Sequence, residues 1–309
     1  MVKAIKKQQS FFIFLKLMLF ASIVLVFYWQ LTKLNFSIKS VELKFPLLFL
    51  LALLLVPLNW FCEWQKWRIT LKAADIRSTN RLAFNAFLAG MVSGMLTPNM
   101  LGNFIGRIFY FQRRDRIAIT VYTMFSNYGQ FAASVIVGLI CIFFLNETPF
   151  GLLPDYFIWL ALPVILFVFI LHFYFDFFFS KFFKRRMREL RIQYKNRLLS
   201  AFHWKVLCWS LFRLSVFSIQ FFLVLVAFGA EFNFILFLWI GQYYFWVTLA
   251  PSLFFGKVVI RDSIALWVLV AVVSNSTTIV AASFSIWIIN LLLPTLFSVL
   301  FFRSKKVIV

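Results

Sequence analysis

The sequence predicts an all-α fold, a polytopic transmembrane helical bundle, on three observations. Of 309 residues, 63% are hydrophobic and only 13% are charged, and phenylalanine alone supplies 45; no soluble core of this size needs so much apolar surface. Apolar runs of about 20 residues, the length that crosses the hydrocarbon, recur along the chain. Lys and Arg give a formal net charge of +21 and gather mostly in short gaps between those runs. There they orient the chain and contact anionic headgroups, so we expect membrane lipids and no nucleic acid as partners.

The apolar runs predict about eight spans within a single integral membrane domain, residues 1–309. The first run follows a basic tail as a secretory signal does, but it is long and no small-residue cleavage site follows it, so we expect it to remain as a span. The predicted spans are 11–31, 45–61, 117–145, 157–180, 206–228, 232–250, 263–280 and 281–302.

The charges predict how the spans are oriented in an inner, cytoplasmic membrane. The N-terminal tail and the segments 66–81 and 181–197 are rich in Lys and Arg, which places them in the cytoplasm. The loops 146–156 and 229–233 contain acids and no Lys or Arg, as external loops do. Three residues of the first external loop oppose this assignment: Lys33, Lys39 and Lys44.

A basic segment, 181–205, separates the two halves of the chain. Its apolar residues recur at helical spacing, which predicts an interfacial helix on the anionic inner leaflet. A solvated charged linker is the alternative, because the apolar stripe is short. The stripe consists of Phe183, Met187, Leu190, Tyr194 and Leu198.

The stretch "LTPNMLGNFIGR" at 96–107 predicts a break at membrane depth. If the chain is cytoplasmic at Arg81 and again at 113–116, the runs on either side of Pro98 cannot form one crossing, but they can form a re-entrant hairpin. Pro98 removes a backbone donor and disfavours helix in the residue before it. We therefore expect the tip at Thr97, Pro98 and Asn99, with Gly102 and Gly106 as further breaks in the returning arm.

A re-entrant hairpin implies a cavity, because non-helical backbone at membrane depth must be buried in protein or line a wet space. Arg107 on the returning arm strengthens this expectation, since an arginine in the bilayer is costly unless it faces an aqueous cleft, an acid or a phosphate. The alternative is that Arg107 snorkels to the cytoplasmic headgroups.

The stretch "LAPSLFFGKVVIRDS" at 249–263 repeats the design, again with five residues from Gly to Arg. Paired Pro/Gly-interrupted segments in two halves indicate a transporter's midplane site. We therefore expect pseudo-repeated halves, 1–180 with a break near 97–107 and 206–309 with a break near 250–261. Two merely kinked helices are the alternative. The second set of residues is Pro251, Gly256 and Arg261.

The sequence leaves the orientation of the second stretch open. A cytoplasmic tail at 303–306 after two final crossings would make 232–250 a crossing and put Lys257 and Arg261 near the cytoplasm. If the stretch were instead a hairpin opening outward, the C-terminus would be external. The basic tail favours the first arrangement.

Asn59 and Glu63 lie four residues apart on one helical face. Glu63 is placed to neutralise Lys66 or an arginine of the cavity. The alternative is that this segment is an interfacial anchor of Trp, Lys and Arg at the cytoplasmic boundary.

The sequence offers little chemistry of other kinds. Two His and three isolated Cys do not provide a metal-ligand pattern, so we expect neither a metal nor a cofactor. Paired carboxylates, a nucleophile with its base and a phosphate-binding loop are also missing, so we do not expect an enzyme.

These segments resemble a known family, the lysylphosphatidylglycerol synthase transmembrane region, whose members are also called flippase-like membrane proteins. The resemblance runs from the second apolar run to the end. It rests on "LNWFCEWQKWRITL" (58–71), "LTPNMLGNFIGR" (96–107) and "LAPSLFFGKVVIRDSIAL" (249–266), which are similar to the family's Asn-Trp, Thr-Pro-Asn and second Pro…Arg elements in order and spacing.

The resemblance implies movement of lipids or lipid-linked headgroups across the cytoplasmic membrane. It covers the membrane part only, so it implies no synthase activity, and the protein partners it implies are a second copy of the chain or a separate synthase. Relatives often carry an acid after the Gly of each element, where this chain has Asn103 and Lys257. We therefore expect an anionic headgroup in a cationic cavity flanked by Arg107, Lys257 and Arg261. The alternatives are a membrane enzyme acting on lipid and a non-transporting scaffold.

Overall fold

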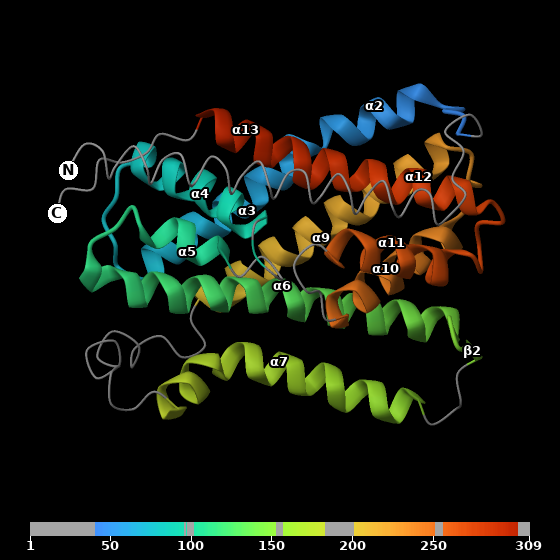
Figure 1. Cartoon of the computed structure of the whole chain (residues 1–309). Helices are drawn as coiled ribbons and strands as arrows, with labels where there is room; N and C mark the ends of the chain where they lie inside the picture. Colours follow the sequence, from blue (N-terminus) through green and yellow to red (C-terminus); the bar gives the residue numbers. More distant parts are fainter. Residues whose placement is uncertain are drawn as a thin grey trace.

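The computed structural model describes residues 41–95, 97, 102–152, 157–182, 201–250 and 256–301. The predicted span 11–31, most of the basic segment 181–205, and the expected breaks Pro98 and Pro251 lie outside these residues. The described helices run side by side along one long axis, with α7 (Phe157–Phe182) forming an outer layer against α6 (Arg116–Leu145) (Figure 1).

The predicted transmembrane helical bundle is confirmed. Among the described residues, four helices are long and apolar enough to cross a membrane, and two shorter apolar helices accompany them. The long helices are Pro46–Ala73, Arg116–Leu145, Ala201–Ala227 and Ser276–Val299, and the shorter ones are Trp159–Tyr174 and Phe234–Leu249.

The second predicted span ends later than its apolar run. Helix α2 (Pro46–Leu54) continues into α3 (Val56–Ala73), with a proline in the first turn of α3 that lacks an amide donor. The predicted end at 61 was wrong because the polar residues that follow it, among them Glu63 and Lys66, are buried inside the bundle. They therefore belong to the helix core and do not mark an exit to water.

The long helix α9 (Ala201–Ala227) runs antiparallel to α2 and α3. Gln220 donates to the Ala52 carbonyl at 3.0 Å, and the Phe45 amide donates to the Ala227 carbonyl at 3.1 Å. Near the other end of the pair, Phe202 joins the cluster that contains Ala73.

The first broken element folds as a helical hairpin. Helix α4 (Asn80–Met95) and the short helix α5 (Gly102–Ile108) pack against each other, and a 3₁₀ turn, η3 (Arg113–Asp115), leads from α5 into α6. At the tip, the Thr97 hydroxyl accepts a hydrogen bond from the Gly102 amide at 2.5 Å, so it caps the first turn of α5.

The second broken element also folds as a hairpin, from α10 (Phe234–Leu249) and α11 (Gly256–Leu269). The 16 residues of α10 span about 24 Å, against about 45 Å for the 30 residues of α6. Phe245 packs on α6 at Gly138, so α10 ends near the middle of α6. The predicted crossing 232–250 was therefore wrong, since this helix reaches only half-way along the bundle.

One final helix crosses the bundle, where the apolar runs predicted two. It is built from α12 (Ser276–Trp287), a π-helical turn η4 (Ile288–Leu292) and α13 (Leu293–Phe301). The predicted spans 263–280 and 281–302 were wrong because the chain turns at 270–275. The Asn275 side chain accepts from the Thr277 amide at 3.0 Å and so starts the new helix.

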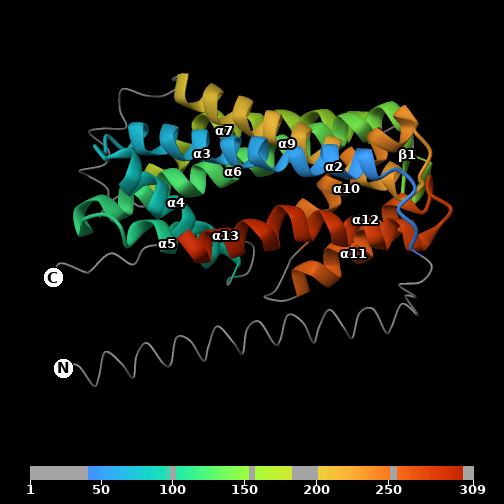
Figure 2. The same cartoon turned by 90° about the horizontal axis from the view of Figure 1, so that it is seen from above.

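One end of the bundle, the β end, carries the short strands β1 (Glu147–Thr148) and β2 (Gly151–Leu152) (Figure 1). The α10–α11 hairpin opens toward this end, where Phe150 packs on Trp267 at 4.8 Å between ring centroids. The α4–α5 hairpin opens toward the opposite end, where α5 is followed by η3 and α6. Seen from above, the last helix passes both hairpins, with α12 against α11 and α13 against α4 (Figure 2).

Apart from α7, the described helices therefore form two units, each made of a crossing, a hairpin and a second crossing, and the two units point in opposite directions. The first consists of α2–α3, α4–α5 and α6, and the second of α9, α10–α11 and α12–α13. Because the second hairpin returns to the β end, a single crossing brings α13 back to the opposite end. The alternative that paired an outward-opening second hairpin with an external C-terminus assumed two further crossings, whereas the described chain after this hairpin makes one.

Candidate functional site

A cavity of about 390 Å³ lies between the two hairpins, and its lining includes Asn127, Gln130 and Ser134 from the middle of α6. Its walls come from α3, α4, α5, α6, α9, α10, α11 and the last helix. Both hairpins contribute their inner ends, and the π-helical turn η4 contributes Asn290. The broken elements and the irregular turn thus converge on one space.

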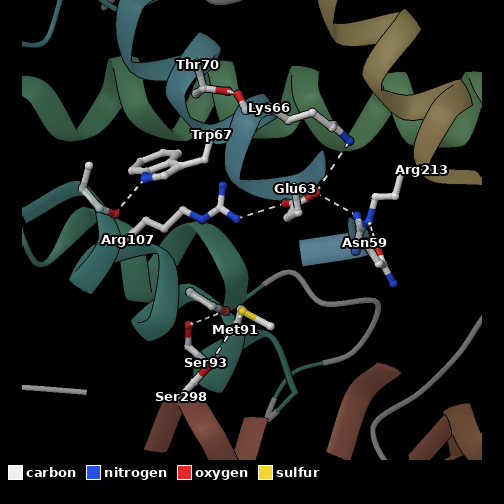
Figure 3. A network of polar contacts seen from close by, with 12 residues as sticks. Asn59, Glu63, Lys66, Trp67, Thr70, Met91, Ser93, Arg107, Arg213 and Ser298 are labelled. Atoms are coloured by element: carbon white, nitrogen blue, oxygen red, sulfur yellow. Dashed lines mark hydrogen bonds and ion pairs between the residues drawn. The ribbon is translucent and has the colours of Figure 1, made fainter. Parts of the chain in front are cut away.

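Glu63 is the centre of a charged cluster on one wall (Figure 3). Its carboxylate accepts from Arg213 Nη1 at 2.7 Å and from Arg107 Nη2 at 3.1 Å. Lys66 Nζ, one turn along α3, lies 3.8 Å from the same carboxylate. Lys66 and Arg107 are each only 1% exposed. These contacts place Glu63 inward, so α3 is not an interfacial anchor at this level.

Asn59 extends the cluster toward the last helix. Its side-chain oxygen accepts from Arg213 Nε at 2.9 Å, and its amide nitrogen donates to the Asn290 side chain at 2.7 Å. Arg213 therefore donates hydrogen bonds to two residues of α3 at once. The planar guanidinium holds its donors in a fixed fork, which the ammonium group of lysine does not. The network ties α3, α9 and the π-helical turn together at the cavity.

Arg107 lies in a pocket prepared by aromatic rings. Its guanidinium carbon is 4.6 Å from the ring centroid of Trp67 and 5.7 Å from that of Phe87, within range of cation–π attraction. Trp67 is held in place by a hydrogen bond to the Ala83 carbonyl at 2.9 Å. Arg107 does not snorkel toward the bundle end, since its side chain is buried between these rings and Glu63.

Close approach of α4 and α5 brings Arg107 to this position. A Cβ added to Gly90 would lie 2.5 Å from Asn103 Oδ1 and 2.8 Å from Arg107 Cγ, so only glycine leaves room for both side chains. The hydroxyl of Ser93 bridges the arms, because it donates to the Gly102 carbonyl at 2.5 Å and accepts from the Gly106 amide at 3.1 Å.

Arg261 enters the cavity from the second hairpin. Its Nε donates to the Tyr243 hydroxyl at 2.7 Å, which joins α11 to α10. The next residue, Asp262, is buried and accepts from Ser283 of α12. Arg261 thus has a neutral hydrogen-bond partner, whereas Arg107 has a carboxylate.

Four of the residues predicted for the site line the cavity with Arg107: Asn59, Glu63, Asn103 and Arg261. Asn103, at the position where relatives often carry an acid, is buried and its Oδ1 has no hydrogen-bond partner among the described residues. Lys257 lies in the first turn of α11, and its side chain is outside the described part of the structure. Gly102 and Gly256 begin the returning helices α5 and α11, whereas Gly106 lies inside α5 and does not break it.

Sequence reasoning missed Arg213 and Asn290. A signal for Arg213 was present, because an ionisable residue within an apolar run is a candidate functional residue by default. Asn290 carried no comparable signal, since a lone amide in a membrane helix most often joins helices by hydrogen bonds.

The arrangement is suited to binding an anion. The described lining residues carry cations, amides and a carboxylate that is already held by cations. Charged groups at membrane depth are retained at substrate or ion pathways.

A comparison with known protein families shows that one family matches nearly the whole chain. The family described as "Lysylphosphatidylglycerol synthase TM region" matches residues 13–298. Comparisons with curated proteins and with solved structures returned no match. The matched residues include both hairpins and every residue of the cavity wall named above, and the family supports a lipid-related role in the membrane. The chain belongs to the family of lysylphosphatidylglycerol synthase transmembrane regions.

Proposed function

We propose that this protein moves a lipid, or a lipid-linked headgroup, across the cytoplasmic membrane. The observation that carries the proposal is the cavity at mid-height between oppositely directed hairpins, with Arg107 on one and Arg261 on the other. A headgroup would occupy this cavity while its acyl chains stay in the surrounding lipid. An anionic headgroup fits because arginine binds phosphate oxygens strongly and with defined geometry.

The inverted arrangement of the hairpins supports transport. In transporters, broken helices from inverted repeats meet at a midplane site, and the repeats rock against each other around it. In this protein Glu63 and Asn59 connect the first unit to α9 and to the last helix. Breaking and remaking these contacts would open the cavity toward one end and then the other.

The proposal includes an orientation and excludes catalysis. The β end, which holds the acidic loops, faces outward. The basic segments 66–81 and 113–116, on either side of the α4–α5 hairpin, face the cytoplasm, as do the ends of the chain. The α4–α5 pair is then re-entrant from the cytoplasm and the α10–α11 pair from outside. The protein binds and releases lipid without altering it, because the described lining residues supply binding groups and no activated nucleophile.

The test is a leaflet-transfer assay in proteoliposomes. Vesicles of phosphatidylcholine would carry a tail-labelled anionic phospholipid, either phosphatidylglycerol or phosphatidic acid, whose accessible fraction is read by a membrane-impermeant quencher. Arg107→Ala and Arg261→Ala should abolish transfer while the protein still inserts. Arg68→Ala is the matched control, since Arg68 is exposed on α3. Unchanged transfer in both cavity variants would refute the proposal.

A further inference from the structure

The cavity has more positive charge than its own acids neutralise. Of the described residues that line it, four are cationic and one is acidic, which leaves a formal charge of +3. Glu63 is shared by three of the cations, and Arg261 has the neutral Tyr243 hydroxyl. Even when the buried Asp262 beside Arg261 is counted, a charge of +2 remains. The cations are Lys66, Arg107, Arg213 and Arg261.

Unpaired hydrogen-bond donors accompany this excess charge. Within the described part of the chain, four residues of the cavity wall have a buried side-chain nitrogen without a partner. Buried donors are almost always satisfied, so such a group calls for a ligand or water. The four nitrogens come from four different elements, which surround the cavity. They are Trp60 Nε1, Arg107 Nε, Arg261 Nη2 and Asn290 Nδ2.

A ligand that balances the excess positive charge and also accepts hydrogen bonds from these nitrogens carries two negative charges and several acceptor oxygens. A phosphodiester has a single charge and would leave at least one positive charge without a counterion in a site where charge is expensive. A phosphomonoester has a charge of about −1.5 to −2 near pH 7 and three acceptor oxygens. A diphosphate supplies at least as much.

The size of the cavity favours a compact group. Its volume of about 390 Å³ lies at the small end of the range of ligand pockets, about 300 to 1,000 Å³. A phosphate or diphosphate fits this space with its attached chain leaving the cavity, whereas a large glycan would not.

We infer that the headgroup bound between the hairpins is a phosphomonoester or diphosphate carrying two or more negative charges, on a lipid anchor, in preference to a phosphodiester. This inference rests on the proposed function, because it names the substrate class of the same cavity. The charged groups facing the ligand are Lys66 and Glu63 of α3, Arg107 of α5, Arg213 of α9, and Arg261 with its neighbour Asp262 of α11.

The test compares matched ligands by titration of the purified full chain in a non-ionic detergent. Dioctanoyl phosphatidic acid supplies the phosphomonoester and dioctanoyl phosphatidylglycerol the phosphodiester on identical tails. At pH 7.5 the phosphatidic acid should bind at least about tenfold more tightly, as expected for charge-assisted hydrogen bonds to additional donors. Equal affinities would overturn the inference.

A pH series tests the same point without any substitution. The second ionisation of a phosphomonoester has a pKa of about 6, so at pH 5 phosphatidic acid carries close to one charge. The preference should then fall several-fold between pH 7.5 and pH 5, while phosphatidylglycerol, which keeps its single charge, serves as the internal reference. A preference independent of pH would contradict recognition of the second charge.

Two variants test the role of Arg261 in this preference, and two soluble anions test whether the ligand needs a lipid anchor. Arg261→Gln should reduce the preference several-fold, whereas Arg68→Gln, which removes an exposed charge from α3, should leave it unchanged. Inorganic phosphate and pyrophosphate should bind more weakly than dioctanoyl phosphatidic acid; equal binding would show that the ligand is a soluble anion and would overturn the lipid anchor. Selective binding without leaflet transfer would refute the proposed transport alone, and transfer with equal binding would refute this inference alone.

Discussion

Arg107 and Arg261 lie on hairpins that enter the bundle from opposite ends, yet both line the same cavity. Each follows the first glycine of its returning arm by five residues. The relationship is not symmetric in chemistry, since Arg107 contacts the carboxylate of Glu63 and Arg261 contacts the hydroxyl of Tyr243. The first arginine therefore shares one carboxylate with two other cations, whereas the second donates to a neutral hydroxyl.

Glu63→Gln should destabilise the protein strongly. The substitution removes the carboxylate that holds the buried cations Lys66 and Arg107, which would then repel each other. Removing one partner from a buried ion pair costs about 3–5 kcal/mol, and the 21% exposure of the Arg213 side chain reduces its share. The thermal unfolding midpoint in detergent, read by size-exclusion chromatography after heating, should fall by several degrees.

Glu42→Gln is the matched control for this change, because Glu42 is exposed and should tolerate it. Adding Lys66→Met to Glu63→Gln should restore part of the lost stability, since it removes one of the cations left unpaired. If Glu63→Gln were as stable as Glu42→Gln, the carboxylate would not be the counterion that the geometry indicates.

Gly90→Ala should displace Arg107 and impair transfer. The new Cβ would lie 2.8 Å from Arg107 Cγ and 2.5 Å from Asn103 Oδ1, so these two side chains, or α5 with them, must shift away from α4. Overpacking of this kind costs about 1–3 kcal/mol. Leaflet transfer should fall at least about tenfold if the shift moves the guanidinium by even about 1 Å.

Phe84→Leu on the exposed face of α4 provides the comparison for Gly90→Ala, because it changes a side chain of the same helix away from the cavity. Normal transfer by the Gly90→Ala protein would mean that the hairpin can absorb a methyl group. The position of Arg107 would then not depend on close packing of its two arms.

The broken elements could be found from the sequence because Pro, Gly and Arg are exceptional inside apolar runs. The length of α3 could not be predicted in this way, because the low hydropathy of Asn59, Glu63 and Lys66 indicates that the chain leaves the membrane there. Their burial depends on partners such as Arg213, 150 residues from Glu63. Whether an arginine in an apolar run faces lipid or a cavity is decided by contacts of this kind.

The end of the second hairpin could have been predicted, but the apolar count concealed it. Residues 264–273 and 279–302 are almost continuously apolar, so length alone divided them into two spans. The polar group "SNSTT" at 274–278 is a turn and helix-start signal, and Asn275 caps α12. The helix-cap signal at Asn275 therefore predicts the turn between α11 and α12 better than the length of the apolar runs does.

Asn275→Ala should weaken the start of α12. The Asn275 side-chain oxygen accepts from the Thr277 amide at 3.0 Å and from the Thr277 hydroxyl at 2.6 Å. Loss of an N-cap costs about 0.5–2 kcal/mol, so the unfolding midpoint should fall by a few degrees. Asn275→Asp keeps an acceptor and should retain most of the stability. Equal losses for the two variants would show that the side chain does not act as a cap.

Cysteine labelling should place residues 147 and 274 on one side of the membrane and residue 77 on the other. Cys208 is exposed and would first be replaced by serine, whereas Cys62 and Cys141 are buried. In the structure Glu147 and Ser274 both lie toward the β end, and Arg77 follows α3 at the opposite end. If the β end faces outward, as we propose, a membrane-impermeant maleimide should label Glu147→Cys and Ser274→Cys in intact cells, and Arg77→Cys only after permeabilisation. If 263–280 were a crossing, position 274 would lie within the bilayer and react poorly from either side. If Ser274→Cys and Arg77→Cys were both labelled only after permeabilisation, the turn after α11 would lie on the same side of the membrane as the end of α3. That result would contradict a second hairpin that opens toward the β end.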